Sequence, residues 1–103
     1  ETKPQFIVSD YQKVVRDFAF AIEEKYSSGE IISLVKKIDK ELIKSVKIFD
    51  VYQGENIKKG KKSIAFNVTF EPKDKTLSEE DIEKISKKII STVQEKTGAT
   101  LRS

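Results

Sequence analysis

An acidic side chain and an aromatic ring, Asp50 and Tyr52, stand two positions apart in a mostly apolar segment. Side chains alternate between the two faces of a strand, so these two share one face while Phe49 and Val51 take the other. The ring offers a surface on which a nucleotide base can stack, and the carboxylate can accept hydrogen bonds from a base edge. Groups of this kind are typical of surfaces that recognise single-stranded RNA.

A basic loop follows this segment directly. Gly54–Lys62 holds four lysines and one glutamate, a local charge of +3 that equals the net charge of the chain. Charge runs are most often solvated surface, and this is the simplest interpretation of Lys58, Lys59, Lys61 and Lys62. Their functional interpretation is that they hold RNA phosphates without reading sequence. Three such contacts would give a salt slope of only about −2 on a single strand, which is typical of weak binding.

The composition excludes several kinds of active site. The 103 residues include no cysteine and no histidine. Disulfides, thiolate nucleophiles, histidine bases and histidine metal ligands are therefore impossible. No apolar run approaches the roughly 20 residues of a membrane span, and no signal-like stretch is visible at the N-terminus. The length fits one domain with one core, and a pI near 9.0 favours a polyanionic partner.

The hydrophobic pattern predicts four strands. A period of two is clearest where Ile64, Phe66, Val68 and Phe70 alternate with small or polar residues. Gly54 and Gly60 interrupt the chain between the second and third strands. The expected strands are Val14–Glu23, Leu42–Gln53, Ser63–Pro72 and a short last strand within Ala99–Ser103.

Two helices are predicted between these strands. Ser28 is the expected N-cap of the first, and Ser78 with Asp81 has capping-box spacing for the second, which Gly98 ends. Both helices carry an apolar stripe at helical spacing. The stripe residues are Ile31, Leu34, Val35 and Ile38 in the first helix, and Ile82, Ile85, Ile89 and Val93 in the second.

The element order predicts an α+β fold, a ferredoxin-like βαββαβ sandwich with a four-stranded antiparallel sheet and two helices on one face. Residues 1–13 are expected to form a lead-in segment and residues 14–103 the domain. The phenylalanines at 18, 20, 49, 66 and 70 are expected in the core. The other sheet face is expected to be open and mostly small or polar, formed by Asp17, Ala19, Ala21, Ile48, Asp50, Tyr52, Ser63, Ala65, Asn67 and Thr69.

From about Ser9 to Arg102 the sequence resembles the ferredoxin-fold anticodon-binding domain at the C-terminus of phenylalanyl-tRNA synthetase beta subunits. Six pieces match in order and at the right spacing. They are Val14 with Arg16-Asp17, Ser45-Val46 with Phe49-Asp50-Val51-Tyr52-Gln53-Gly54, Gly60-Lys61-Lys62-Ser63-Ile64-Ala65-Phe66, Thr69-Phe70, Lys75-Thr76-Leu77-Ser78-Glu79-Glu80, and Gly98-Ala99-Thr100-Leu101-Arg102. Two departures precede or open the first strand: Gln12 stands where the family often has proline, and Val15-Arg16 where it often has two arginines.

The resemblance implies a non-catalytic module that binds the anticodon of tRNA(Phe) and positions the tRNA for aminoacylation elsewhere in the enzyme. By similarity, Tyr52 would stack on the first anticodon base, and Asp50 and Ser63 would hydrogen-bond base edges. No cofactor is expected in this fragment, because the ATP and magnesium sites of the family's enzyme lie in other domains. The implied partners are the rest of the beta subunit and the alpha subunit, in a cytoplasmic setting without a membrane, and the isolated domain is expected to be a monomer.

Two residues keep alternative interpretations. Asp50 repels phosphate, which favours a base-edge role, and a carboxylate can accept from the N1 or N2 donor of guanine. An ion pair between Asp50 and a nearby lysine is equally compatible with the residues alone. For Arg16, an ion pair with Asp17 is preferred over a contact with the RNA backbone.

Other functions of the same fold fit less well. A small acyl-phosphate hydrolase would need a glycine- and arginine-rich anion loop after the first strand, but Glu23–Gly29 carries two glutamates and one lysine. A protein-interaction or ligand-sensing domain would need apolar residues on the open face, where Ile48 is the only large aliphatic expected. A general RNA-recognition motif would place aromatics where this chain has Ser63, Ala65 and Asn67.

Overall fold

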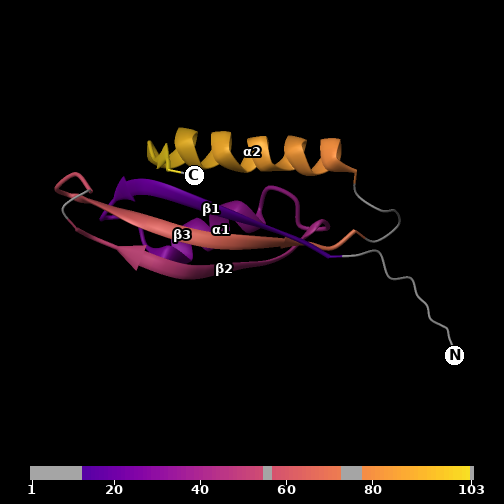
Figure 1. Cartoon of the computed structure of the whole chain (residues 1–103), viewed down its shortest axis with the longest axis horizontal. Helices are drawn as coiled ribbons and strands as arrows, with labels where there is room; N and C mark the ends of the chain where they lie inside the picture. The colour runs from indigo at the N-terminus through magenta and orange to yellow at the C-terminus, as the bar shows by residue number, and fades with distance from the viewer. Residues whose placement is uncertain (1–12, 55–56, 73–77, 103) are drawn as a thin grey trace, which may run out of the picture.

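The computed structural model describes residues 13–54, 57–72 and 78–102 (Figure 1). The elements are β1 (Val14–Glu23), α1 (Ser28–Lys36), β2 (Ile43–Tyr52), β3 (Lys61–Phe70), α2 (Glu79–Thr97) and β4 (Thr100–Leu101). This is the predicted βαββαβ order, so the predicted fold class is confirmed. Residues 1–12 lie outside the described ranges, and the lead-in over 1–13 stays a prediction. No helix in the described ranges combines the length and apolar character needed to cross a bilayer.

The four strands form one antiparallel sheet in the order β2-β3-β1-β4. β1 and β3 pair along all ten of their residues, from Val14 opposite Phe70 to Glu23 opposite Lys61. β2 is one edge of the sheet. The short β4 forms the other, opposite residues 20 and 21 of β1.

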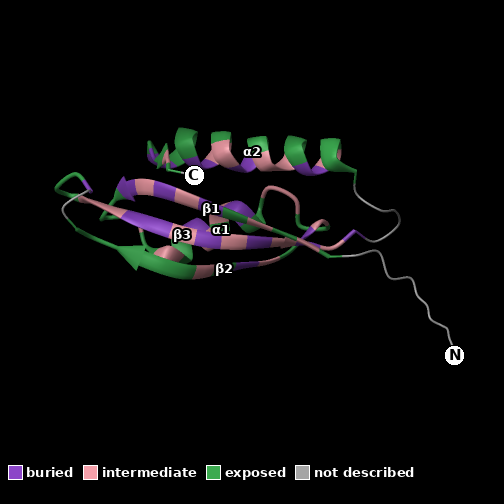
Figure 2. Cartoon of the chain, in the orientation of Figure 1, coloured by how far each residue is buried: buried purple, intermediate pink, exposed green. Residues whose placement is uncertain are grey.

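The core lies between one face of the sheet and the two helices. The even-numbered residues from Phe18 to Ile22 and from Ile64 to Phe70 are buried, and their odd-numbered neighbours are less so, which gives the alternation of β3 in Figure 2. The Phe66 ring stacks against Phe18 and Phe20, with centroids 5.5 and 5.9 Å apart. The buried helix residues in the same cluster are Ile31, Val35, Ile82, Ile89 and Val93. Both helices therefore cover one face, as predicted, and the other face is open.

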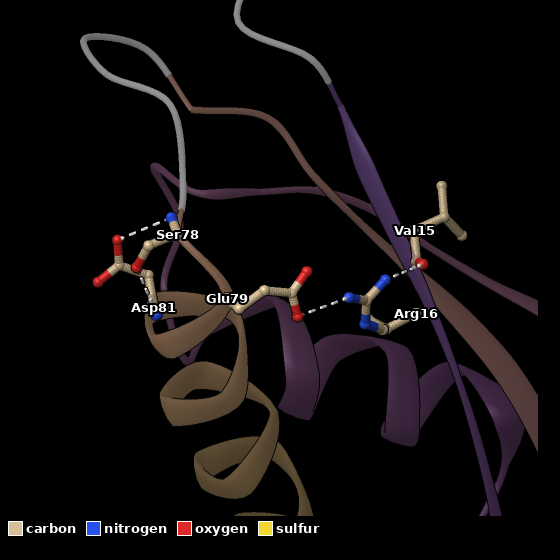
Figure 3. Close-up of polar contacts among 5 residues, drawn as sticks. All are labelled: Val15, Arg16, Ser78, Glu79 and Asp81. Carbon is tan, nitrogen blue, oxygen red and sulfur yellow. Dashed lines mark hydrogen bonds and ion pairs between the residues drawn. The ribbon is translucent and has the colours of Figure 1, made fainter.

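The helix ends follow local capping chemistry. The N-cap of α1 is Ser27 rather than the predicted Ser28, because Glu30 lies three positions after Ser27 and completes a capping box with it. The predicted box of Ser78 and Asp81 at the start of α2 is confirmed (Figure 3). Gly98 ends α2 with a left-handed φ of 72°, a conformation that glycine adopts without steric cost.

The predicted boundaries of β3 differ by two residues at each end, because the strand runs from Lys61 to Phe70 rather than from Ser63 to Pro72. The sequence predicts that the third strand begins at Ser63, but Lys61 and Lys62 already pair with Glu23 and Ile22 of β1. β1 is long enough to provide partners for these two residues, so half of the lysines predicted for the loop belong to the sheet. β2 runs from Ile43 to Tyr52, one residue shorter at each end than predicted.

Candidate nucleic-acid interface

The ladder between β2 and β3 is irregular between Ile43 and Ser45, and a β-bulge at Phe49 then divides β2. Its pairing with β3 shifts by one between Ile48, opposite Phe66, and Asp50, opposite Ala65, so Phe49 is an extra residue in the ladder. Phe66 is fully buried on the helix-covered face, whereas Ala65 belongs to the open face. The bulge therefore turns Ile48 toward the core and places Asp50 on the open face.

Two sequence predictions are wrong because of this bulge. Strict alternation places Ile48 on the open face, but it is partly buried and packs against the core. Phe49 is predicted to be a core residue, but 57% of its surface is exposed. In an unbroken strand Ile48 and Asp50 would lie on the same face of the sheet. The extra residue between them places the two side chains on opposite faces.

The open face brings Asp50, Tyr52 and Ser63 together, as predicted. Tyr52 lies directly opposite Ser63, and Asp50 lies opposite the next open-face position of β3, Ala65. Side chains paired in this way have Cβ atoms about 4.5–5.5 Å apart. Tyr52 is 45% exposed and Asp50 is exposed, whereas Ser63 is only 7% exposed. A ring, a carboxylate and a hydroxyl thus form one compact group at the end of the sheet.

The described residues supply no polar partners for the side chains of Asp50 and Ser63. Within the described ranges, Asp50 makes no ion pair or side-chain hydrogen bond, so the alternative ion pair with a lysine has no support there. The Ser63 hydroxyl likewise has no hydrogen-bond partner among the described residues, although Ser63 is buried. A buried polar group without a partner costs about 1–3 kcal/mol. A ligand with a polar edge could satisfy both groups at once.

The four lysines divide between different surfaces. Lys61 lies opposite Glu23 in the ladder and on the same strand face as Ser63, two residues further on. Lys62 lies opposite the buried Ile22, on the helix-covered side. Lys58 and Lys59 are exposed in the loop between β2 and β3. Alternation therefore places one strand lysine beside the group of Asp50, Tyr52 and Ser63, and turns the other away from it.

Arg16 lies apart from this group. It pairs with Val68, whose side chain is buried on the helix-covered face. Figure 3 shows its guanidinium reaching Glu79 at the start of α2, with Nη2 3.7 Å from Oε2, while Nη1 donates to the Val15 carbonyl. The preferred prediction of a pair with Asp17 is wrong, because neighbouring residues of a strand point to opposite faces. The RNA contact of Arg16 stays a prediction.

Two residues of the predicted last strand, Thr100 and Arg102, were not predicted to lie on the open face. Thr100 pairs with Ala21, and the Arg102 N–H donates to the Ala19 carbonyl at 2.7 Å, which continues the ladder by one residue. Both therefore lie on the open face, across a floor of small residues that includes Ala65. Extending the strand alternation through the last segment would have found them.

Two hollows among the described residues lie away from this group. One of about 610 Å³ is lined by residues of α1 and by Lys96 and Thr97 at the end of α2, and one of about 410 Å³ lies between β1 and α2. Neither is lined by Asp50, Tyr52 or Ser63. The described residues also contain no cluster of acidic side chains suited to a metal ion. The group on the open face therefore suits a flat ligand lying on the sheet.

Comparison with known proteins gives the family. The ferredoxin-fold anticodon binding domain matches residues 9–102. Phenylalanine–tRNA ligase beta subunits of Bradyrhizobium diazoefficiens and Rhodospirillum rubrum are each 45% identical, over 101 and 103 residues. That of Rickettsia bellii is 44% identical over 100 residues. These alignments cover 98%, 100% and 97% of this chain, but the chain spans only 12–13% of the length of each relative. The chain belongs to the ferredoxin-fold anticodon-binding domain family, in its phenylalanine–tRNA ligase beta subunit branch.

Proposed function

We propose that this domain binds the anticodon of tRNA(Phe) on its open sheet face, and so positions the tRNA for aminoacylation by other domains of a phenylalanine–tRNA ligase. One observation carries the proposal. Tyr52, Asp50 and Ser63 lie together on the open face, and the two polar groups lack protein partners within the described ranges. The match of residues 9–102 to an anticodon-binding family supports the same ligand.

Each of the three residues has a separate role in the proposal. The Tyr52 ring stacks on the first anticodon base, an interaction that is worth about 1–3 kcal/mol per base. Asp50 accepts hydrogen bonds from the N1 and N2 donors of a guanine at that position. Its charge repels phosphate, so it contributes base preference rather than general affinity. The Ser63 hydroxyl completes the contacts with the base edge.

The remaining roles depend on the parent enzyme. Lys58, Lys59 and Lys61 hold phosphates near the base, and ATP and magnesium act in other domains. The partners are the rest of the beta subunit and the alpha subunit, in the cytoplasm. The support for this setting is that the relatives are phenylalanine–tRNA ligase beta subunits.

NMR shift mapping at low salt tests the proposal directly. The labelled domain is titrated with a phenylalanine anticodon stem–loop, and separately with a stem–loop whose first anticodon base is adenine instead of guanine. We expect shifts at Asp50, Tyr52 and Ser63 that weaken with the changed base.

Two results would contradict the proposal. Equal shifts for both RNAs, confined to Lys58–Lys62, would leave only a weak electrostatic surface. An absence of shifts at millimolar RNA would exclude useful binding by the isolated domain. The same titration with a Tyr52→Ala variant is the control for stacking.

A second candidate function is docking of another protein domain. Phe49 and Val51 favour it, because these neighbouring apolar side chains are 57% and 48% exposed at the end of β2. Shift mapping with the unlabelled remainder of the beta subunit would test it. Shifts at both residues would support docking, and unchanged positions would exclude it for this surface.

A further inference from the structure

We propose that Gly54 is a positioning residue for the Tyr52 ring, and that its missing side chain sets where a base can stack. This inference rests on the proposed RNA binding. A Cβ atom built on Gly54 would overlap the Oη and Cζ atoms of Tyr52. The phenol end of the ring therefore occupies the space that any side chain at position 54 would need.

The backbone of Gly54 is held in place, so the ring would be the part to move. The Gly54 carbonyl accepts a hydrogen bond from the N–H of Ile57 at 3.0 Å. Ile57 is itself buried, with 9% of its surface exposed. The far end of an exposed tyrosine moves more easily than an anchored backbone, because few contacts oppose its rotation.

An unusual backbone angle does not explain the glycine. Among the described glycines only Gly60 and Gly98 have positive φ, so the φ of Gly54 is not one that requires glycine. A Gly54→Ala substitution would therefore act through the tyrosine ring. It would shift the ring from its place beside Ser63, where a stacked base would meet Asp50 and the hydroxyl together.

A double-mutant cycle tests this inference. Gly54→Ala, Tyr52→Ala and the double variant are compared for affinity to the phenylalanine anticodon stem–loop, with urea unfolding as a measure of folding. We expect Tyr52→Ala to lower affinity by about 5- to 150-fold and Gly54→Ala by about tenfold. In the Tyr52→Ala background, Gly54→Ala should change affinity less than about twofold, because the group it acts through is gone.

Gly29→Ala is the matched control. It makes the same chemical change at a glycine whose added Cβ would meet only the Ser27 Oγ, at 3.9 Å, which is ordinary contact. It should leave RNA affinity unchanged.

A measurement without RNA checks the packing itself: the Gly54 Hα resonances should differ between the wild type and Tyr52→Ala, because the ring current of Tyr52 acts on them.

The possible results separate this inference from the proposed function. The positioning role would be overturned if Gly54→Ala lowered RNA affinity equally in the wild-type and Tyr52→Ala backgrounds. It would also be overturned if Gly54→Ala kept wild-type affinity while Tyr52→Ala bound RNA weakly. Unchanged Gly54 Hα resonances in Tyr52→Ala would show that the ring does not rest on the glycine. If Tyr52→Ala binds RNA like the wild type, the stacking role of Tyr52 fails. The positioning role of Gly54 in RNA binding then fails too, even if the Gly54 Hα resonances confirm that the ring packs on the glycine.

Discussion

The two halves of β2 differ in what holds them. Ile43–Ile48 packs its apolar side chains against the core, with Ile43 and Val46 each only 5% exposed. Phe49–Tyr52 is exposed at every position, which Figure 2 shows as the uniformly exposed end of the strand. One strand therefore combines a segment held by side-chain burial with a segment held mainly by its ladder to β3.

This difference separates stability from binding. Substitutions before the bulge remove buried side-chain packing, whereas substitutions after it remove groups that touch little protein. The bulge is the boundary, because it lets Ile48 face the core while Asp50 and Tyr52 face outward. The following variants test the two sides of that boundary, the bulge itself and the loop after β2.

Ile43→Ala should have the largest effect. Removing a buried isoleucine side chain costs about 2–5 kcal/mol, because apolar burial is reduced and a cavity is left behind. Val51→Ala, on the exposed side of the bulge, should change the free energy of unfolding by about 0.5 kcal/mol or less. Urea unfolding of both variants measures the contrast, and equal losses of stability would mean that the second half also supports the fold.

Tyr52→Ala should weaken RNA binding and leave stability almost unchanged. We expect it to weaken binding of the anticodon stem–loop by about 1–3 kcal/mol. The free energy of unfolding should change by about 0.5 kcal/mol or less, because Tyr52 is exposed and lies outside the core cluster. Calorimetric titration beside urea unfolding checks this. A loss of stability as large as that of Ile43→Ala would place the ring among the structural residues.

Deleting Phe49 tests the bulge itself. Without it, Ile48 and Asp50 would pair with Phe66 and Ala65 in a regular ladder, so both flanking segments keep their faces. We expect a folded domain with a free energy of unfolding within about 1 kcal/mol of the wild type. NMR contacts between Tyr52 and Ser63 should persist. NMR contacts between the Tyr52 ring and core residues would mean that the register of β2 against β3 has slipped.

The smallest effect is expected in the loop after β2. Replacing Lys58 and Lys59 together with glutamine should reduce the magnitude of the salt slope of RNA binding by about 0.7 for each phosphate that is no longer neutralised. Lys62→Gln is the matched control, because Lys62 lies on the helix-covered side. Lys62→Gln removes one charge where the loop variant removes two, so a reduction half as large as that from the loop variant would show that the slope reports overall charge.

Where periodicity and local chemistry agree, the sequence predicts the fold closely. β1 has the predicted bounds Val14–Glu23, and α2 begins at the Ser78 cap and ends at Gly98 as expected. The stripes of both helices and the alternation of β3 predict which sheet face is covered. The group of Asp50, Tyr52 and Ser63 follows from the same alternation.

The errors come from features that depend on pairing with distant residues. The bulge at Phe49 leaves no local signal, because Ile48 and Phe49 are both apolar and either could face the core. The start of β3 depends on how far β1 extends opposite it. The contact between Gly54 and Tyr52 depends on the path of the loop. The Ser27 cap, by contrast, was predictable from the position of Glu30.

The bulge also matters for how molecules of this domain meet each other. β2 is an edge strand of ten residues, and a regular edge of that length offers a row of unpaired backbone groups to a second copy. The bulge interrupts that row, and Lys44 and Lys47 put positive charge along it. The same extra residue that turns Asp50 outward thus protects the domain against edge-to-edge aggregation.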